Sequence, residues 1–378
     1  MPRPARGRKT QAPHLRARTL RGLPRKMKTP LLAVLLSLSA VRAGAAVAAK
    51  PAEEPKAPQL EFPTPPEPTR IRWVRTVRSI DDLRGRKRGF LSKLSDAVLG
   101  GDSSAALFDR PYGVWVDARG RVLLPDTAQG AVHVLDLSAR TDEKFTGEGA
   151  GALVSPSGAA SDPAGNLYVA DSGDASLKCF GPDRKFRWKT EALGGEGTFG
   201  RPAAAAWSPK GEVLVLDAGR RSVVALSPEG KFLREFLRGG KDEAALGMTA
   251  NLWVDKEGSI YESDPVAGRI HIFSPDGKIK FGFGENGDRP GYMARPRGVA
   301  TDSDGNVYVV DAVFNRVQIF NGQGKLLLYF AAPGARDGEL SLPAGLFIDA
   351  ADRIYLVDAG NARLQVFQYI KVPETAYK

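Results

Sequence analysis

Cysteine and histidine, the side chains that most often build disulfides and transition-metal sites, are scarce in this sequence. The 378 residues include one cysteine, Cys179, and three histidines. One cysteine excludes an intramolecular disulfide, and without a C-x-x-C-H motif the chain cannot attach a c-type haem covalently. The fold must therefore be stabilised by burial and hydrogen bonding.

Acidic residues are absent from the first 49 positions, which hold eleven of the 54 Lys and Arg residues. The remainder of the chain has 43 basic and 43 acidic side chains, so the formal net charge of +11 comes from the N-terminal segment. A domain without excess positive charge is not expected to bind nucleic acid.

Long apolar runs are also missing. The longest lies over residues 31–41, follows the cationic start Met27-Lys28, and precedes small residues that end at Ala45 and Ala48. This order is typical of a secretory signal peptide, and the run is too short to span a membrane. We interpret residues 1–49 as a leader with a cleavable signal peptide, with Met27 as an alternative start, and expect a periplasmic or extracellular protein. No cysteine stands near the expected cleavage sites, so lipid attachment at a mature N-terminal cysteine is not expected. An uncleaved amphipathic anchor is the alternative interpretation.

Seven prolines between residues 51 and 68 mark the next segment. Proline-rich chains favour extended polyproline II geometry, so residues 50–69 are predicted to form a semi-rigid linker.

The rest of the sequence is repetitive. A short apolar segment that ends in aspartate recurs six times, at intervals of 45 to 47 residues. The six copies are VLLPD, LYVAD, VLVLD, IYESD, VYVVD and IYLVD, and they end at Asp126, Asp171, Asp217, Asp264, Asp311 and Asp358. A period of this length indicates a solenoid or a propeller.

Each period is typical of four short β-strands and shows no helical periodicity. In the fifth period strands are expected at 298–301, 306–310, 317–320 and 325–330, joined in part by the turn segments SDG and NGQG. Four antiparallel strands per repeat predict an all-β, six-bladed β-propeller whose blades begin near residue 110.

The last repeat offers only three strands, so the ring must be completed from elsewhere. Residues 70–79, RIRWVRTVRS, have the alternation of a strand and are predicted to close the ring from the N-terminal side. The propeller domain then spans residues 70–372. Residues 90–99 predict a short helix packed on the propeller, with a docking helix for an anionic partner or membrane surface as the alternative.

At residues 296–320 the repeat follows the pattern P-x-G-[VL]-A-x-D-x-x-G-x-[VI]-Y-V-x-D-x-x-x-x-R-[VIL]-x-[VIL]-F, which resembles the NHL repeat. The resemblance covers about residues 70–370. Within it, the sequence is similar to secreted bacterial six-bladed NHL proteins that are encoded near multihaem cytochromes. This resemblance implies an accessory role in an electron-transfer system of the periplasm or outer membrane, with a multihaem cytochrome or another envelope protein as partner. The first three blades depart from the pattern, since Ala131, Ser176 and Ser222 stand where Arg269, Arg316 and Arg363 stand later.

An aspartate that recurs once per blade is expected to be structural, because catalysis requires asymmetry. A carboxylate at a strand end can accept hydrogen bonds from backbone N–H groups of the following loop. An arginine of the same loop, as Arg316 after Asp311, can pair with it. We therefore interpret the six aspartates as a repeated fastening and expect no catalytic residue, bound metal or cofactor.

A metal-dependent lyase or lactonase with an ion in the central channel is the alternative function. His133 and His271 occupy the same third-strand position in opposite blades and are not expected to converge on one zinc ion. Asn251 is the one polar exception among mostly apolar first strands. Trp115 and Trp253 are interpreted as packing between blades, with a constriction of the channel as the alternative; Cys179 is expected to be buried.

The loops at one end of the ring carry the candidates for binding. Irregular loops on a rigid scaffold are common recognition sites, and Arg and aromatic side chains suit a protein partner. The predicted partner-binding residues are Phe199, Arg220, Arg221, Lys241, Arg289, Tyr292, Phe314 and Asn315. We expect a monomeric, non-enzymatic propeller.

Overall fold

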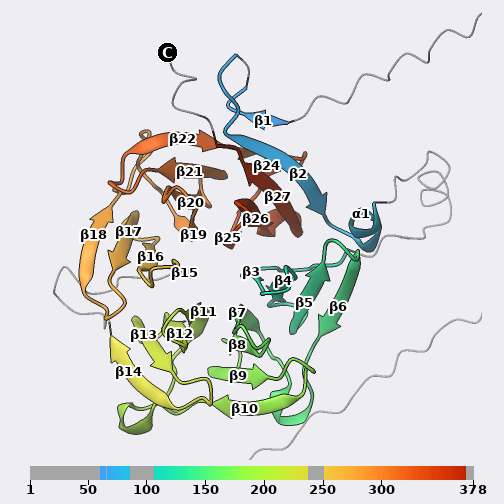
Figure 1. Ribbon diagram of the computed structural model, residues 1–378, viewed down its shortest axis with the longest axis vertical. Helices are drawn as coiled ribbons and strands as arrows, with labels where there is room; N and C mark the ends of the chain where they lie inside the picture. The colour runs from blue at the N-terminus through green and yellow to red at the C-terminus, as the bar shows by residue number, and fades with distance from the viewer. Residues whose placement is uncertain (1–59, 65, 86–105, 237–250, 372–378) are drawn as a thin grey trace, which may run out of the picture. The chain divides into compact units, whose positions relative to one another are not determined.

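The computed structural model describes residues 60–64, 66–85, 106–236 and 251–371. The predicted signal peptide, the predicted helix at 90–99 and Lys241 lie outside these ranges. The described residues form six antiparallel sheets arranged as blades around a central channel (Figure 1). The predicted six-bladed β-propeller is confirmed. Among the described residues, no helix is long and apolar enough to cross a membrane.

The first three blades follow one another along the chain. Blade one contains β3 (Trp115–Val116), β4 (Val122–Asp126), β5 (Ala131–Asp136) and β6 (Thr141–Phe145). Blade two contains β7 (Pro156–Ser161), β8 (Leu167–Asp171), β9 (Ser176–Phe180) and β10 (Phe186–Thr190). Blade three contains β11 (Pro202–Ser208), β12 (Glu212–Asp217), β13 (Ser222–Leu226) and β14 (Phe232–Phe236). In each blade the first strand lies nearest the channel and the fourth lies at the rim (Figure 1).

The next two blades repeat this order. Blade four contains β15 (Asn251–Val254), β16 (Ile260–Asp264), β17 (Arg269–Phe273) and β18 (Ile279–Phe283). Blade five contains β19 (Pro296–Thr301), β20 (Val307–Asp311), β21 (Arg316–Phe320) and β22 (Leu326–Phe330). Short elements lie between the blades: α1 (Ile80–Arg84), the 3-10 turns η1 (Gly149–Gly151) and η2 (Gly194–Glu196), and the parallel pair β23 (Ala332–Pro333) and β24 (Glu339–Leu340). A third 3-10 turn, η3 (Ala359–Asn361), lies within the sixth blade.

The sixth blade joins both ends of the domain. It contains β25 (Leu346–Ile348), β26 (Arg353–Asp358) and β27 (Arg363–Tyr369), and β2 (Ile71–Val77) pairs antiparallel with β27 as its fourth strand. This pairing matches the predicted N-terminal closure. Part of the segment expected to be linker adds a fifth strand, β1 (Glu61–Phe62), whose Phe62 ring lies 5.7 Å from Phe330.

The repeated aspartates lie at the ends of the second strands and are buried. Asp217 shows the arrangement most completely. Its carboxylate accepts hydrogen bonds from the backbone N–H groups of Gly200 and Arg201, 2.7 Å each, before the first strand of its blade, and from those of Gly219 and Arg220, 2.9 and 3.0 Å, in the loop that follows. In blades one, two, three and five this carboxylate accepts from backbone N–H groups both at the entry of the blade and in the loop after the second strand, whereas the sequence predicted only the contact with that loop.

In some blades the repeated aspartate also forms an ion pair with a basic side chain. Arg363 donates from Nε to Asp358 at 2.6 Å, and both side chains are buried. In blade two the buried Lys178 takes that role, with its Nζ 2.7 Å from Asp171. The predicted pair of Asp311 and Arg316 does not form: the guanidinium of Arg316 instead lies between two aromatic rings, 4.6 Å from that of Phe314 and 5.0 Å from that of Tyr329.

A second set of carboxylates fastens the opposite end of the blades. Each lies in the turn between the first and second strands and accepts a hydrogen bond from a tyrosine hydroxyl on the second strand. The pairs are Tyr168–Asp162, Tyr261–Asp255, Tyr308–Asp302 and Tyr355–Asp349, at 3.0 to 3.2 Å. Burial, followed by the charge of the acceptor carboxylate, raises the pKa of all four phenols.

Neighbouring blades approach closely at the channel because their first strands carry small residues. A Cβ atom on Gly158 would lie 2.6 Å from Cα of Ala204 in the next blade, so glycine is required there. Farther out, phenylalanines pack across the blade boundaries, with ring centroids 4.8 Å apart for Phe145 and Phe180 and for Phe283 and Phe320. Such aromatic pairs contribute about 0.5–1.5 kcal/mol each beyond their burial.

Candidate functional site

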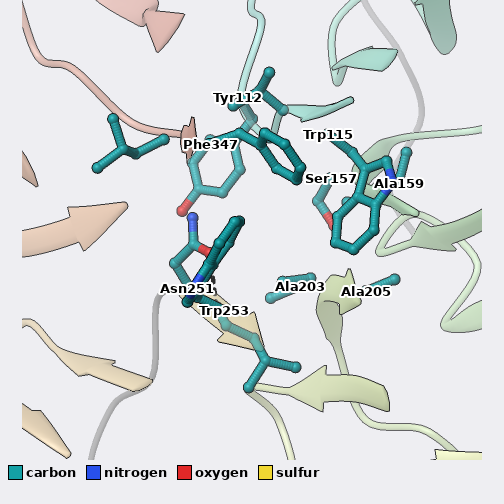
Figure 2. Close-up of a pocket in the computed structure, with 15 residues that line it drawn as sticks. Tyr112, Trp115, Ser157, Ala159, Ala203, Ala205, Asn251, Trp253 and Phe347 are labelled. Carbon is teal, nitrogen blue, oxygen red and sulfur yellow. Dashed lines mark hydrogen bonds between the residues drawn. The ribbon is translucent and has the colours of Figure 1, made fainter. Parts of the chain in front are cut away.

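The central channel is closed by three aromatic side chains. The ring of Phe347 lies 5.2 Å from that of Trp115 and 5.0 Å from that of Trp253, both in edge-to-face geometry. Figure 2 shows these side chains converging on the channel from three different blades. The tryptophans therefore line the channel and also pack between blades, since Trp253 donates from Nε1 to the hydroxyl of Thr301 in blade five at 3.1 Å.

Little space is left beside this aromatic closure. The channel cavity measures about 20 Å³, close to the volume that one water molecule requires. Its polar lining includes Tyr112, Ser157 and Asn251, which Figure 2 places around the opening. The hydroxyl of Ser157 donates to the carbonyl of Pro202 at 3.1 Å, so part of this polarity serves the backbone.

The histidines do not meet in this cavity. His133 lies 3.0 Å from Asp142, and His271 lies 2.9 Å from Glu262, each within its own blade. Burial raises the pKa of Glu262 to about 7. In the part of the chain that the structure describes, no three His, Cys, Asp or Glu side chains are grouped as metal ligands would be. Cys179 is buried, which raises the pKa of its thiol to about 12.

We use the name mouth face for the end of the ring at which the first strands begin and the second strands end.

Three of the predicted partner-binding residues have side chains that are buried or hydrogen-bonded within the fold. Phe199 is only 3% exposed and packs in the core, so it is not part of an exposed face. Arg220 pairs with Glu235 through Nε and Nη2, both at 2.8 Å. The Asn315 side-chain oxygen accepts from the Leu342 N–H at 2.7 Å and so joins blades five and six.

Four other predicted residues, which the structure describes, remain at least partly accessible on this face. Arg289 and Tyr292 lie in the loop before β19, and a hydrogen bond to Glu285 raises the pKa of the Tyr292 phenol. Arg221 is exposed beside the loop that follows β12, and Phe314 is half-buried against Arg316. Val313, next to Phe314, was not singled out from the sequence and is 51% exposed.

Three arginines of the mouth face were missed in the sequence. Arg110, Arg201 and Arg295 each precede a proline at the entry of a blade, and each is exposed. Their backbone N–H groups donate to Asp126, Asp217 and Asp311 at 3.1, 2.7 and 3.3 Å. The recurring Arg-Pro dipeptide at one repeat position was the signal that could have identified them.

Arg110 and Arg201 line one hollow beside the channel opening. This mouth pocket measures about 290 Å³ and is lined by Arg110, Tyr112, Thr127, Ser155, Ser157, Ser172, Arg201 and Ala203. It spans the entries of blades one, two and three. Blade two carries the smaller Ser155 at the position where the other two blades carry arginine.

A larger hollow of about 620 Å³ lies on the opposite face, under blades four to six. Its lining is acidic, but its carboxylates are used within the fold. Asp352, for example, accepts from both the N–H and the hydroxyl of Ser303, at 2.8 and 2.7 Å. This hollow is therefore less suited to binding than the mouth pocket.

The fold and its repeats define the class of the protein. Residues 153–180 and 293–320 match the NHL repeat. These segments contain the first three strands of blades two and five, and each begins just before the backbone groups that its aspartate holds. The chain is thus a six-bladed β-propeller with NHL repeats, and blade two fits the repeat despite its serine at position 176.

Several solved structures share this fold at low sequence identity. A catalytically inactive variant of virginiamycin B lyase from Staphylococcus aureus, solved with quinupristin, is 12% identical over 71% of this chain and 84% of its own, with a TM-score of 0.53. Hydrazine synthase from Kuenenia stuttgartiensis is 12% identical over 72% of this chain and 99% of its own, with a TM-score of 0.52. A protein of unknown function from Bacteroides thetaiotaomicron is 14% identical over 71% of each chain, with a TM-score of 0.57. At such identities the likeness shows the fold alone. No curated protein matches this sequence.

Proposed function

We propose that this protein is an exported, non-enzymatic propeller scaffold that binds a partner protein through its mouth face. The partner is a protein of the cell envelope, with a multihaem cytochrome as the first candidate, and the scaffold acts as an accessory to an electron-transfer system. The signal peptide predicted from the sequence of residues 1–49 and the resemblance to secreted NHL propellers support the location and the partner class.

The observation that carries the proposal is the contrast between the channel and the face around it. The channel is filled by Trp115, Trp253 and Phe347 and has room for about one water molecule. The face around it carries exposed arginines together with Tyr292 and Val313 on irregular loops. Rigid scaffolds with variable loops bind partners there, and Arg and aromatic residues dominate the binding energy of many interfaces.

A pulldown from a periplasmic fraction tests this proposal. The bait is the full chain, compared with the double variant Arg289→Glu/Tyr292→Ala on the mouth face and with Lys256→Glu on the opposite face, where the Lys256 side chain is 80% exposed. We expect one envelope protein to be retained by the parent and by Lys256→Glu and lost with the double variant. Retention of no envelope protein, or equal retention by all three baits, would refute the proposal.

A further inference from the structure

The mouth pocket has the chemistry of an anion site. Two arginines, Arg110 and Arg201, line it, and no Asp or Glu residue does. Within the described ranges of the chain, neither guanidinium forms an ion pair or a side-chain hydrogen bond. Arginine presents its N–H donors in a planar fork that suits carboxylate and phosphate groups.

Other polar groups of the pocket are already hydrogen-bonded within the fold. The hydroxyls of Thr127 and Ser172 already donate to the carbonyls of Arg110 and Ser155, at 3.2 and 3.0 Å. The carbonyls around the pocket are thus occupied, while the two guanidinium groups are not. A cationic ligand would be repelled by the two guanidinium groups, whereas an oxyanion supplies charged acceptors for their N–H donors.

The positions of the two arginines are fixed by buried parts of the fold. The backbone N–H of each is held by a buried carboxylate, Asp126 for Arg110 and Asp217 for Arg201, and a proline follows each arginine. Their backbones are thereby oriented before any ligand arrives, which lowers the entropic cost of binding. Only the side chains need to be ordered.

The shape of the pocket also suits a small molecule. Its volume of about 290 Å³ lies near the lower limit of ligand pockets, which begin at roughly 300 Å³. The Tyr112 ring and Ala203 supply apolar surface beside the donors. Small ligand sites commonly combine such surface with a few polar groups that fix orientation.

From these observations we propose that the mouth pocket binds a small organic oxyanion, a carboxylate or a phosphate, between Arg110 and Arg201. The site lies on the mouth face, yet the proposal holds whether or not a protein docks there. The anion is bound and not transformed, since no nucleophile or general base lines the pocket with an activating partner among the described residues.

Isothermal titration calorimetry on the full chain tests this proposal, with succinate and inorganic phosphate as probes and succinamide as the uncharged analogue. We expect saturable binding of at least one anion and none of succinamide. The anion that binds with the higher affinity shows whether the pocket prefers a carboxylate or a phosphate group. Arg110→Gln and Arg201→Gln should each weaken that binding about tenfold or more, since each removes charge-assisted hydrogen bonds.

Two further variants separate the pocket from general charge effects. Arg119→Gln removes the same charge from an exposed arginine in the turn between β3 and β4, at the opposite end of the blade, and should leave binding unchanged. Ser155→Leu fills the pocket without a change of charge and should abolish binding. Absence of binding for both anions, equal weakening by Arg119→Gln, or full binding by Ser155→Leu would each overturn the proposal.

Discussion

Replacing Arg363 by alanine should destabilise the propeller far more than the same change at Arg269. The two residues occupy the same repeat position, opposite the aspartates Asp358 and Asp264 in the strand register. Arg363 is 1% exposed, whereas Arg269 is exposed on blade four. The comparison therefore changes the environment of the arginine and keeps its place in the repeat.

The contacts of Arg363 determine how much free energy of unfolding the substitution should remove. Its guanidinium donates to Asp358 at 2.6 Å and to three backbone carbonyls, those of Ala335, Arg336 and Glu339, at 2.6, 2.8 and 2.7 Å. Removing one partner of a buried ion pair costs about 3–5 kcal/mol, because the other charge stays buried. An exposed substitution such as Arg269→Ala usually changes the free energy of unfolding by less than about 0.5 kcal/mol.

Urea unfolding followed by tryptophan fluorescence measures the difference. For a slope near 3 kcal/mol/M, a loss of about 3–5 kcal/mol lowers the midpoint by about 1 M or more. We expect this shift for Arg363→Ala and almost none for Arg269→Ala. Equal midpoints for the two variants would refute the conclusion that Arg363 fastens the sixth blade.

Three further predictions address closure, protonation and metal content. A chain that begins after residue 79 lacks β2 and leaves β27 as an open sheet edge. It should unfold at a lower urea concentration and self-associate, which size-exclusion chromatography with light scattering would detect. A monomer as stable as the parent would contradict this prediction. The pKa of Glu262 is raised by burial to about 7, so the folded state holds its proton longer than the unfolded state does. Stability should therefore fall by about 3 kcal/mol as the pH rises from 4.5 through 7, and Glu262→Gln should remove most of this slope in urea titrations; an unchanged slope in the variant would assign it to other groups. Dialysis against a chelator should leave the melting temperature unchanged in scanning calorimetry, whereas a marked drop would favour the lyase or lactonase alternative with an ion in the channel.

The repeat made the fold predictable from the sequence. Six copies of one strand-Asp element fixed the blade number, and the missing strand of the last copy pointed to residues 70–79 as the closing strand. Turn glycines and alternating apolar residues gave strand positions in blade five within a few residues of those observed. The short strand β1 was not predicted, because its stability comes from packing Phe62 on distant rings and not from a local pattern.

The site was less predictable, because repeat position alone does not define the environment of a side chain. Arg316 and Arg363 align in sequence, yet the first packs between aromatic rings and the second is buried against Asp358. Phe199 is apolar and lies in a loop, and only the structure shows that the loop folds it inward. Arg110 and Arg201 were overlooked because a pocket formed by three adjacent blades cannot be read from any one repeat.

Site-specific photocrosslinking tests the central claim, binding of a partner through the mouth face, most directly. A photoreactive phenylalanine analogue is placed at Val313 on the mouth face, where the side chain is 51% exposed, or at Lys256 on the opposite face, where it is 80% exposed. After irradiation with a periplasmic fraction, we expect one adduct of defined mass with an envelope protein from position 313 and none from position 256. Adducts from position 256 alone, or the same adduct from both positions, would contradict it.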